Sequence, residues 1–195
     1  MKGPKRMRET APEYIAQCVR LTLDDYRRLP SGLRYELVEG VLRQMTPSPS
    51  MVHQEICKRL ARALLEWVED QDLGKVFFAP ADVVLSEHNV VQPDLFCVSK
   101  ERLGIVEEAN VNGAPDLVVE VLSRGTADWD RITKRRIYGQ FGVRELWLVD
   151  PGGRSVEVAV HDGRELATVQ VYQTGATAES RILKGFALDV DRLFR

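Results

Sequence analysis

The sequence contains no apolar run near the roughly 18 residues that a membrane-spanning helix needs, so we expect no transmembrane segment. Its basic N-terminus, "MKGPKRMRETAPEY", lacks the apolar block of a signal peptide. Cysteine is scarce, and the spacing of Cys18, Cys57 and Cys97 fits neither a disulfide framework nor a zinc-binding motif. We therefore expect a soluble, cytoplasmic protein with free thiols.

The net charge is also small. The 27 Lys and Arg residues nearly balance the 29 Asp and Glu residues, which leaves a charge of −2. A protein that binds nucleic acid mainly through bulk charge is strongly basic, so contacts with phosphates have to come from local patches. Two basic patches are present, residues 2 to 8 and "RITKRR" at 131 to 136. For the first patch, a solvated charged segment is the favoured interpretation.

The composition is that of an ordinary globular protein, 44% hydrophobic and 29% charged. We expect a basic extension over residues 1 to 20 and a single domain over residues 21 to 195. An α/β domain with a mixed central sheet is predicted from the order of the patterns. That order begins with a hairpin turning near Glu39 and Gly40 and a helix over 53 to 70. Three strand-like runs, a helix over 127 to 141 and a further strand follow. The short strands after 154 are expected to cover the core as an added layer.

An acid lies in the middle of the stretch "APDLVVEVLS", residues 114 to 123. The stretch is typical of a strand buried on both faces, yet it contains Glu120, and an unpaired buried carboxylate costs several kcal/mol. A second run, "QPDLFCVS", begins with Asp94. If the two strands pair, both carboxylates converge on one face, where Mg²⁺ would offset their repulsion. The structural alternatives are a buried ion pair for Glu120 and a turn residue for Asp94.

The helix that follows this strand carries a candidate cation. Asp130, Lys134 and Tyr138 are spaced four residues apart and share one helix face. Lys134 can point back over the strand, where a lysine would stabilise charge on a reacting phosphate or orient an attacking water. Core packing is favoured for Tyr138, and pairing with Lys134 for Asp130. Asp116 also follows a proline, but it lies about 13 Å from Glu120 along an extended strand, so we interpret it as structural.

Several short strings occur in the order "RYELVEG", "PSPSMVHQ", "VVQPDLFCVS", "APDLVVEVLS" and "DRITKRRIYGQFGVRELWLVDP". Together they resemble the Uma-type family of "putative restriction endonucleases", which belongs to the PD-(D/E)XK nuclease superfamily. The likeness extends from about Leu21 to the end of the chain. It implies a restriction endonuclease-like core in the order helix, three strands, helix, strand.

The resemblance also implies roles for individual residues. Asp94 matches the aspartate of the family's "PD" and is expected to be the first metal ligand. Glu120 is expected to be the second ligand, and the backbone carbonyl of Val121 the third. The superfamily's lysine normally lies two residues after the glutamate, where this chain has Leu122. Families of this type supply it from the next helix, at the place of Lys134.

Three further residues lie in strings that carry the resemblance. Glu36 matches a characteristic position. Two roles are weighed evenly for it: an additional metal or water ligand, and a structural residue of a salt bridge or of the hairpin. Glu39 falls in the predicted turn and is expected to be structural. For His53, contact with the site or with a phosphate is an alternative to the favoured role as a capping or hydrogen-bonded histidine.

The leading hypothesis is a Mg²⁺-dependent endonuclease that hydrolyses phosphodiester bonds in DNA, with Mn²⁺ as a substitute metal. The alternative is a catalytically inactive nuclease fold that acts as a nucleic-acid-binding or assembly module. A serine hydrolase is disfavoured because no Gly-x-Ser-x-Gly motif is present. A homodimer is expected because cleavage of both DNA strands gains from two sites. The residues give no target sequence and no preference for DNA over RNA.

Overall fold

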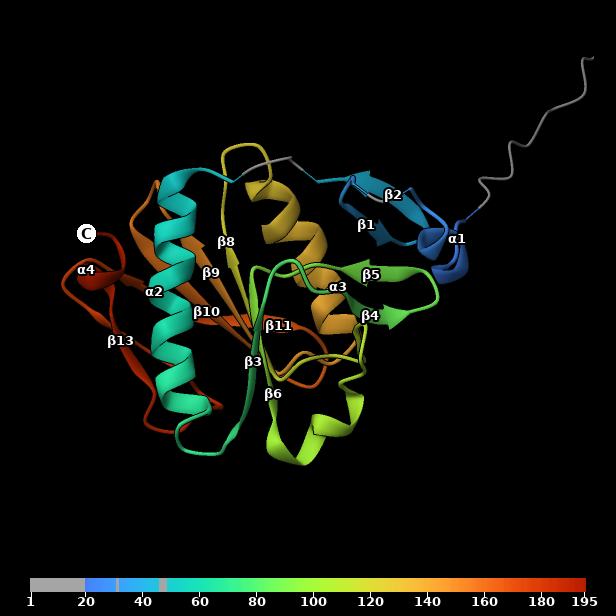
Figure 1. Cartoon of the computed structure of the whole chain (residues 1–195). Helices are drawn as coiled ribbons and strands as arrows, with labels where there is room; N and C mark the ends of the chain where they lie inside the picture. Colours follow the sequence, from blue (N-terminus) through green and yellow to red (C-terminus); the bar gives the residue numbers. More distant parts are fainter. Residues whose placement is uncertain (1–19, 31, 46–48) are drawn as a thin grey trace, which may run out of the picture.

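The structure, a computed structural model, describes residues 20 to 30, 32 to 45 and 49 to 195 (Figure 1). The predicted basic extension lies outside the described residues except for Arg20, and so do its basic patch and Cys18. Cys57 and Cys97 are free thiols, as expected. Within the described part of the chain, no helix is long and apolar enough to cross a membrane.

A six-stranded mixed sheet forms the centre of the fold, with the strand order β11-β10-β9-β8-β6-β3. Strand β8 pairs in parallel with β9 and antiparallel with β6. The strands are β3 (Gly74–Phe78), β6 (Leu95–Ser99), β8 (Leu117–Val121), β9 (Glu145–Asp150), β10 (Ser155–His161) and β11 (Leu166–Gln173).

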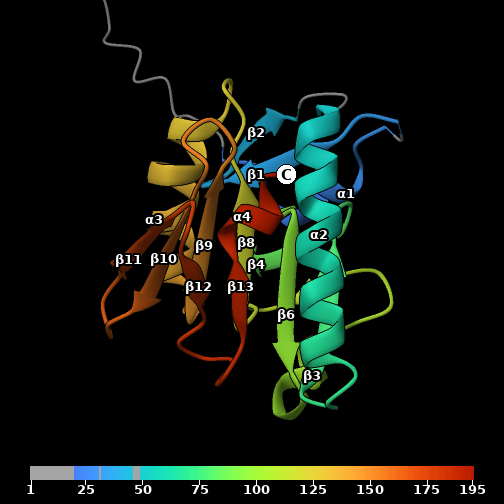
Figure 2. The same ribbon diagram turned by 90° about the vertical axis from the view of Figure 1, so that its left-hand side faces the viewer.

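Helices cover both faces of this sheet (Figures 1 and 2). Helix α2 (Met51–Val68) packs on one face, and the π-helical segment η2 (Trp129–Lys134) with α3 (Arg135–Gln140) packs on the other. The expected core of helix, three strands, helix and strand is thus confirmed as α2, β3, β6, β8, α3 and β9.

The alternation along β8 explains how the sheet is buried on both sides. Leu117, Val119 and Val121 belong to the core beneath α2, while Val118 packs in the core beneath α3. Because successive side chains of a strand point to opposite faces, Glu120 faces α3 together with Val118.

A smaller sheet, in the order β2-β1-β5-β4-β7, lies beside the central one (Figure 1). Its first two strands form the predicted hairpin, and the turn has Glu39 at φ 53° and Gly40 at φ 78°. The strands are β1 (Tyr35–Val38), β2 (Val41–Gln44), β4 (Val83–Ser86), β5 (Asn89–Val91) and β7 (Val111–Asn112).

Two runs that the sequence suggests as single strands are each divided between the two sheets. The run 75 to 86 gives β3 and β4, and the run 90 to 99 gives β5 and β6. A proline, Pro80 or Pro93, lies at each division, and proline has no N–H to continue a ladder. This division matters for the site, because it places Asp94 where the chain enters the central sheet.

The predicted helix over 127 to 141 is correct in place but not in its winding. It begins as the π-helix η2, and the wider turn changes which side chains face inward. Ile132, expected on the apolar stripe, is 68% exposed, whereas Asp130 and Lys134 are buried. Gly142, at φ 85°, follows the helix as predicted.

The C-terminal strands depart in part from the expected covering layer. β10 and β11 extend the central sheet as its edge. Ala178, Phe186 and Val190, in and beside the last strands, do cover the core alongside α2. The remaining elements are α1 (Leu23–Arg27), the 3-10 helix η1 (Lys100–Ile105), β12 (Thr177–Glu179), β13 (Ala187–Asp189) and α4 (Val190–Leu193).

Candidate active site

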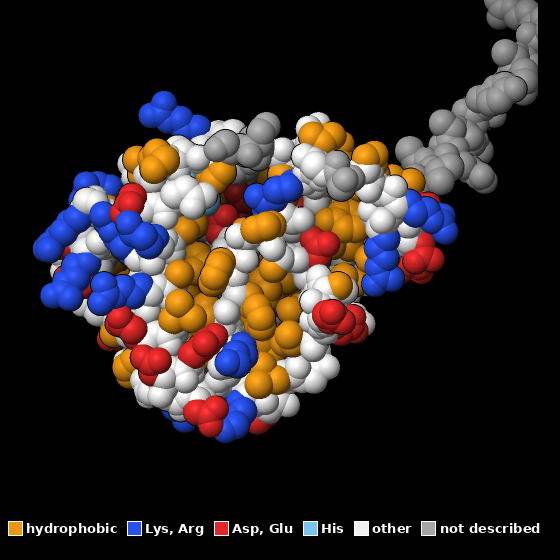
Figure 3. Space-filling view, in the orientation of Figure 1, with side chains coloured by type: hydrophobic (Ala, Val, Ile, Leu, Met, Phe, Trp, Pro, Cys, Tyr) orange, Lys and Arg blue, Asp and Glu red, His pale blue; other side chains and the backbone are white. Residues whose placement is uncertain are grey.

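A cleft with a volume of about 820 Å³ opens beside the C-terminal end of β8. Residues of β1, β2, the start of α2, η2 and the segments after β8 and β9 line it. In Figure 3 acidic side chains are visible in a hollow on this face, next to basic ones. The acids that line the cleft are Glu36, Asp94, Glu120, Asp130 and Asp150.

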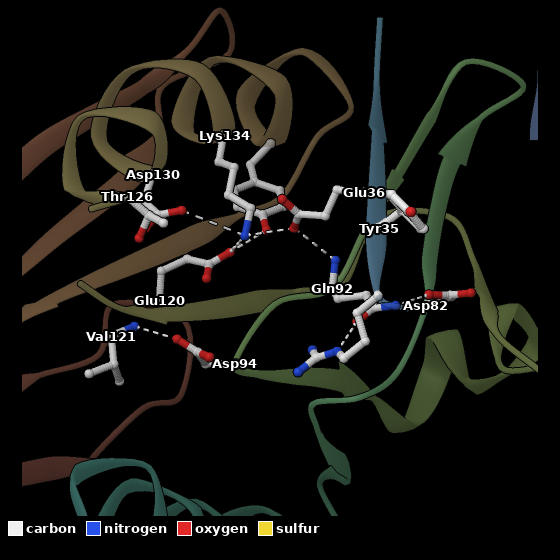
Figure 4. A network of polar contacts seen from close by, with 12 residues as sticks. Tyr35, Glu36, Asp82, Gln92, Asp94, Glu120, Val121, Thr126, Asp130 and Lys134 are labelled. Atoms are coloured by element: carbon white, nitrogen blue, oxygen red, sulfur yellow. Dashed lines mark hydrogen bonds and ion pairs between the residues drawn. The ribbon is translucent and has the colours of Figure 1, made fainter. Parts of the chain in front are cut away.

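Asp94 lies directly before β6, at the floor of this cleft. The pairing of Leu95 with Val119 brings Asp94 opposite Glu120 on the neighbouring strand. The backbone N–H of Val121 donates a hydrogen bond of 2.8 Å to Asp94 Oδ2 (Figure 4). Nε2 of His53 lies 3.2 Å from the same oxygen. The side chain of Asp94 keeps 21% of its surface exposed. Its other oxygen, Oδ1, has no hydrogen-bond partner among the described residues.

Glu120 is almost completely buried, and its oxygens also divide into a bonded and an unbonded one. Oε1 accepts hydrogen bonds from Lys134 Nζ at 2.8 Å and from the Tyr138 hydroxyl at 2.5 Å. Oε2 makes no hydrogen bond to any residue that the structure describes. Burial raises the pKa of Glu120 to about 8, with Asp130 and Asp94 adding to the rise and Lys134 opposing it.

Lys134 lies among three carboxylates. Its Nζ is 2.9 Å from Glu36 Oε1, 2.8 Å from Glu120 Oε1 and 3.7 Å from Asp130 Oδ1 (Figure 4). Burial alone would lower the pKa of Lys134, but the charges of Glu120 and Glu36 raise it well above its usual value. Lys134 therefore stays a cation. Two of its three N–H groups have short partners, which leaves the third for a water or a phosphate.

The residues that the sequence singled out therefore meet in one place. Glu36 takes the salt-bridge alternative through Lys134 and also accepts the N–H of Gln92 at 3.1 Å, while its role as a ligand stays a prediction. Val121 contributes its N–H, and the role of its carbonyl stays a prediction as well. Tyr138 both packs in the core and hydrogen-bonds in the site.

Two acids lie outside the site, as expected from the sequence. Glu39 pairs with Arg136 at 3.0 Å from its place in the hairpin turn. Asp116 accepts hydrogen bonds from Arg102, Arg144 and the N–H of Ser99 at the other end of β8.

His53 contacts the site, which was the less favoured of the two alternatives from the sequence. Its contact with Cys57 was not predicted. The hydrogen-bonded histidine is confirmed, with Asp94 as its partner. On the other side of the ring, Nδ1 lies 3.5 Å from Cys57 Sγ. Both residues lie in α2, and their four-residue spacing was the signal that they share a helix face.

The unbonded oxygens of Asp94 and Glu120 fit a hard divalent cation. Such ions prefer carboxylate oxygens and accept water in their remaining positions. Each carboxylate has one oxygen that no described residue bonds, while its other oxygen fixes its orientation. The donor set therefore fits Mg²⁺ or Mn²⁺.

Comparison with known proteins shows the family and the fold. The family model of Uma2, described as "Putative restriction endonuclease", matches residues 23–191. The chain belongs to the Uma2 family. A crystal structure of a "putative nuclease belonging to DUF820" from Anabaena variabilis has 22% sequence identity and a TM-score of 0.75, covering 89% of this chain and 97% of that chain. No curated protein matches the sequence. The structural likeness shows a restriction endonuclease-like fold, and membership of Uma2 supports a nuclease.

Proposed function

We propose that this Uma2 protein is a Mg²⁺-dependent endonuclease that hydrolyses phosphodiester bonds in DNA. One observation carries the proposal. Asp94, directly before β6, and Glu120, on the neighbouring strand β8, line the cleft, each with one oxygen that no described residue bonds, and Lys134 touches Glu120 at 2.8 Å. This is the donor set and the cation that metal-assisted phosphodiester hydrolysis needs.

The neighbours of the two carboxylates hold them in position. The Val121 N–H and His53 fix one oxygen of Asp94, and both Asp94 and Glu120 line the cleft with a second oxygen that no described residue bonds. Asp94, Glu120 and the carbonyl of Val121 would hold the Mg²⁺ ion, which when bound polarises the phosphate and lowers the pKa of a bound water.

Lys134 supplies a positive charge beside the two carboxylates. Its remaining N–H can donate to a phosphate oxygen, where charge builds up during hydrolysis, or it can orient the attacking water. Glu36 and Asp130 hold the ammonium group beside Glu120. We therefore expect Glu36 to act mainly by positioning Lys134.

The cleft also carries basic side chains, which suit a polyanion. Arg34, Arg43 and Arg124 line it in addition to the buried Lys134, and the guanidinium of Arg43 stacks 4.1 Å from the ring centre of Trp129. Arginine side chains in such a cleft bind the backbone of nucleic acid without reading its sequence. We accordingly propose DNA as the substrate, with weak sequence specificity.

The experiment combines calorimetric titration of Mn²⁺ with a plasmid-nicking assay on the wild type and on Glu120→Gln. The substitution keeps the shape of the side chain and removes its charge. We expect the wild type to bind Mn²⁺ and to nick plasmid, and the variant to lose both. The matched control is Glu39→Gln, an acid of the hairpin turn outside the cleft, which should retain binding and nicking.

A folded wild type that binds no Mn²⁺ would overturn the proposal and favour the inactive binding module instead. The same preparations test the proposed homodimer, for which light scattering should give twice the mass of 22.1 kDa. A cytoplasmic location stays a prediction.

A further inference from the structure

A second group of metal-binding side chains adjoins the cleft. His53 and Cys57 lie one turn apart near the start of α2, and Asp94 precedes β6. One ligand atom from each of the three lies within 4.8 Å of the other two. All three residues are partly buried, and His53 and Asp94 line the cleft, so an ion has a path to them.

The ligand atoms of this group lie near the spacing that one zinc ion needs. Bonds of about 2.0 Å to nitrogen and 2.3 Å to sulfur, at tetrahedral angles, place a nitrogen and a sulfur ligand about 3.5 Å apart and a nitrogen and an oxygen ligand about 3.3 Å apart. In the protein the two short contacts use different ring nitrogens: Nδ1 of His53 is 3.5 Å from Cys57 Sγ, and Nε2 is 3.2 Å from Asp94 Oδ2. One cation takes one ring nitrogen, so zinc binding requires the imidazole to rotate until a single nitrogen meets both neighbours. The starting arrangement is close to this, because one ligand atom from each residue already lies within 4.8 Å of the other two.

The chemistry of the group differs from that of the Asp94 and Glu120 pair. A thiolate and an imidazole prefer Zn²⁺ and similar transition ions, whereas Mg²⁺ takes oxygen ligands. The thiolate of Cys57 and the carboxylate of Asp94 together balance the charge of one dication. Three protein ligands leave the fourth position of the ion to water.

We propose that His53, Cys57 and Asp94 form a binding site for Zn²⁺, and that zinc bound there opposes the Mg²⁺ of the neighbouring site. The opposition follows from Asp94, which both sites use. A zinc ion on Oδ2 competes with the Val121 N–H, which otherwise orients the carboxylate. It also brings a second dication close to the first. The opposition rests on the proposed nuclease function, whereas the zinc site itself does not.

The first measurement is a titration with Co²⁺, a spectroscopic substitute for Zn²⁺, on the full chain. Wild type should develop the near-ultraviolet absorption of a cobalt–thiolate bond, and Zn²⁺ should remove it by competition. Cys57→Ser should lose the band and bind Co²⁺ at least tenfold more weakly. Cys18→Ser and Cys97→Ala, which change the other two cysteines, should keep it.

The second measurement is plasmid nicking in Mg²⁺ with increasing Zn²⁺. Wild type should be inhibited, and Cys57→Ser should nick like wild type without zinc but resist inhibition at least tenfold better. The proposal is overturned by a missing thiolate band in wild type, by a band that survives in Cys57→Ser, or by equal zinc inhibition of both proteins. If wild type nicks no DNA at all, the nuclease proposal fails, while the Co²⁺ titration still decides the zinc site.

Discussion

Lys134 Nζ lies 2.8 Å from Glu120 Oε1, although one side chain comes from a helical turn and the other from a strand. In the PD-(D/E)XK superfamily, which the sequence resembles, the lysine normally lies two residues after the glutamate, on the same strand. Here that position is Leu122, which is 5% exposed and packs in the core beneath α3. The last residue of the π-helix η2 thus brings an ammonium group to Glu120 from above the sheet (Figure 4).

Lys134→Met tests this arrangement. The variant keeps the aliphatic length but leaves Glu36, Glu120 and Asp130 without their shared cation. Breaking a buried ion pair from one side costs about 3 to 5 kcal/mol, and we expect the lower end because Glu120, with its raised pKa, can take up a proton. Nicking should fall about 100-fold, the size of effect seen when one charge-stabilising donor is removed.

Urea denaturation and the nicking rate below the unfolding transition measure the two effects of Lys134→Met. Adding Glu36→Gln should restore part of the lost stability, since one buried acid is then neutral. Lys58→Met, on the exposed side of α2, is the control and should change the free energy of unfolding by less than about 0.5 kcal/mol. Normal nicking by folded Lys134→Met would remove the lysine from the mechanism.

The meeting of Asp94 and Glu120 could be predicted from the sequence because it depends on local patterns. Each acid interrupts or begins an apolar run, and strand alternation determines which side chains share its face. The helix after β8 was found by its own periodicity, which placed Lys134 over the strand. The core of the fold and the composition of the site therefore follow from spacing together with the family resemblance.

What could not be predicted depends on contacts between distant segments. No periodicity shows that a run of 75 to 86 belongs to two sheets, since both halves are equally apolar. The π-helical winding that exposes Ile132 accompanies the burial of Lys134 against Glu36 and Glu120, acids of two other elements. The contact of His53 with Asp94 spans 41 positions and has no local signature.

The stability of the protein should depend on pH through His53. Burial alone would lower the pKa of His53, but its hydrogen bonds to Asp94 and Cys57 raise it to about 10. Because the folded state holds this proton more tightly, the contribution is complete below the ordinary pKa of 6.5 and is lost as the pH rises to about 10. The free energy of unfolding should fall over this interval, and less so in His53→Gln.

Urea titrations of both proteins at pH 6, 7, 8 and 9 give the two slopes for His53. Other groups titrate in this range as well, so the informative quantity is the difference between wild type and variant at each pH. Parallel slopes would mean that folding does not change how tightly His53 holds its proton.

The affinity for Mn²⁺ should rise with pH because Glu120 has to lose a proton before it can act as a ligand. Burial raises the pKa of Glu120 to about 8, so binding should strengthen up to about that pH and then level off. Calorimetry at pH 6.5, 7.5 and 8.5, in buffers of different ionisation enthalpy, measures both the affinity and the protons released. Binding at pH 6.5 with no proton release would show that Glu120 is already ionised.

Substitutions of the two aspartates that follow a proline, Asp94 and Asp116, should have opposite effects: one on the nicking reaction and the other on stability. Asp116 is buried; although burial alone would raise its pKa, the N–H of Ser99 and the guanidinium groups of Arg102 and Arg144 lower it. These bonds tie the end of β6 to the start of β8, so Asp116→Asn should lower the free energy of unfolding by about 1 to 3 kcal/mol. Part of the stability of wild type should be lost in the same way as the pH falls through the lowered pKa.

Asp116→Asn should nevertheless nick plasmid at the wild-type rate below its unfolding transition, because Asp116 lies four residues from Glu120 along β8, at the strand end remote from the cleft. Asp94→Asn should do the opposite, with nicking abolished in a protein that remains folded. Circular dichroism melts and nicking assays on the two variants provide the comparison. The reverse pattern, with nicking lost in folded Asp116→Asn and kept in Asp94→Asn, would move the reaction to the other end of the strand.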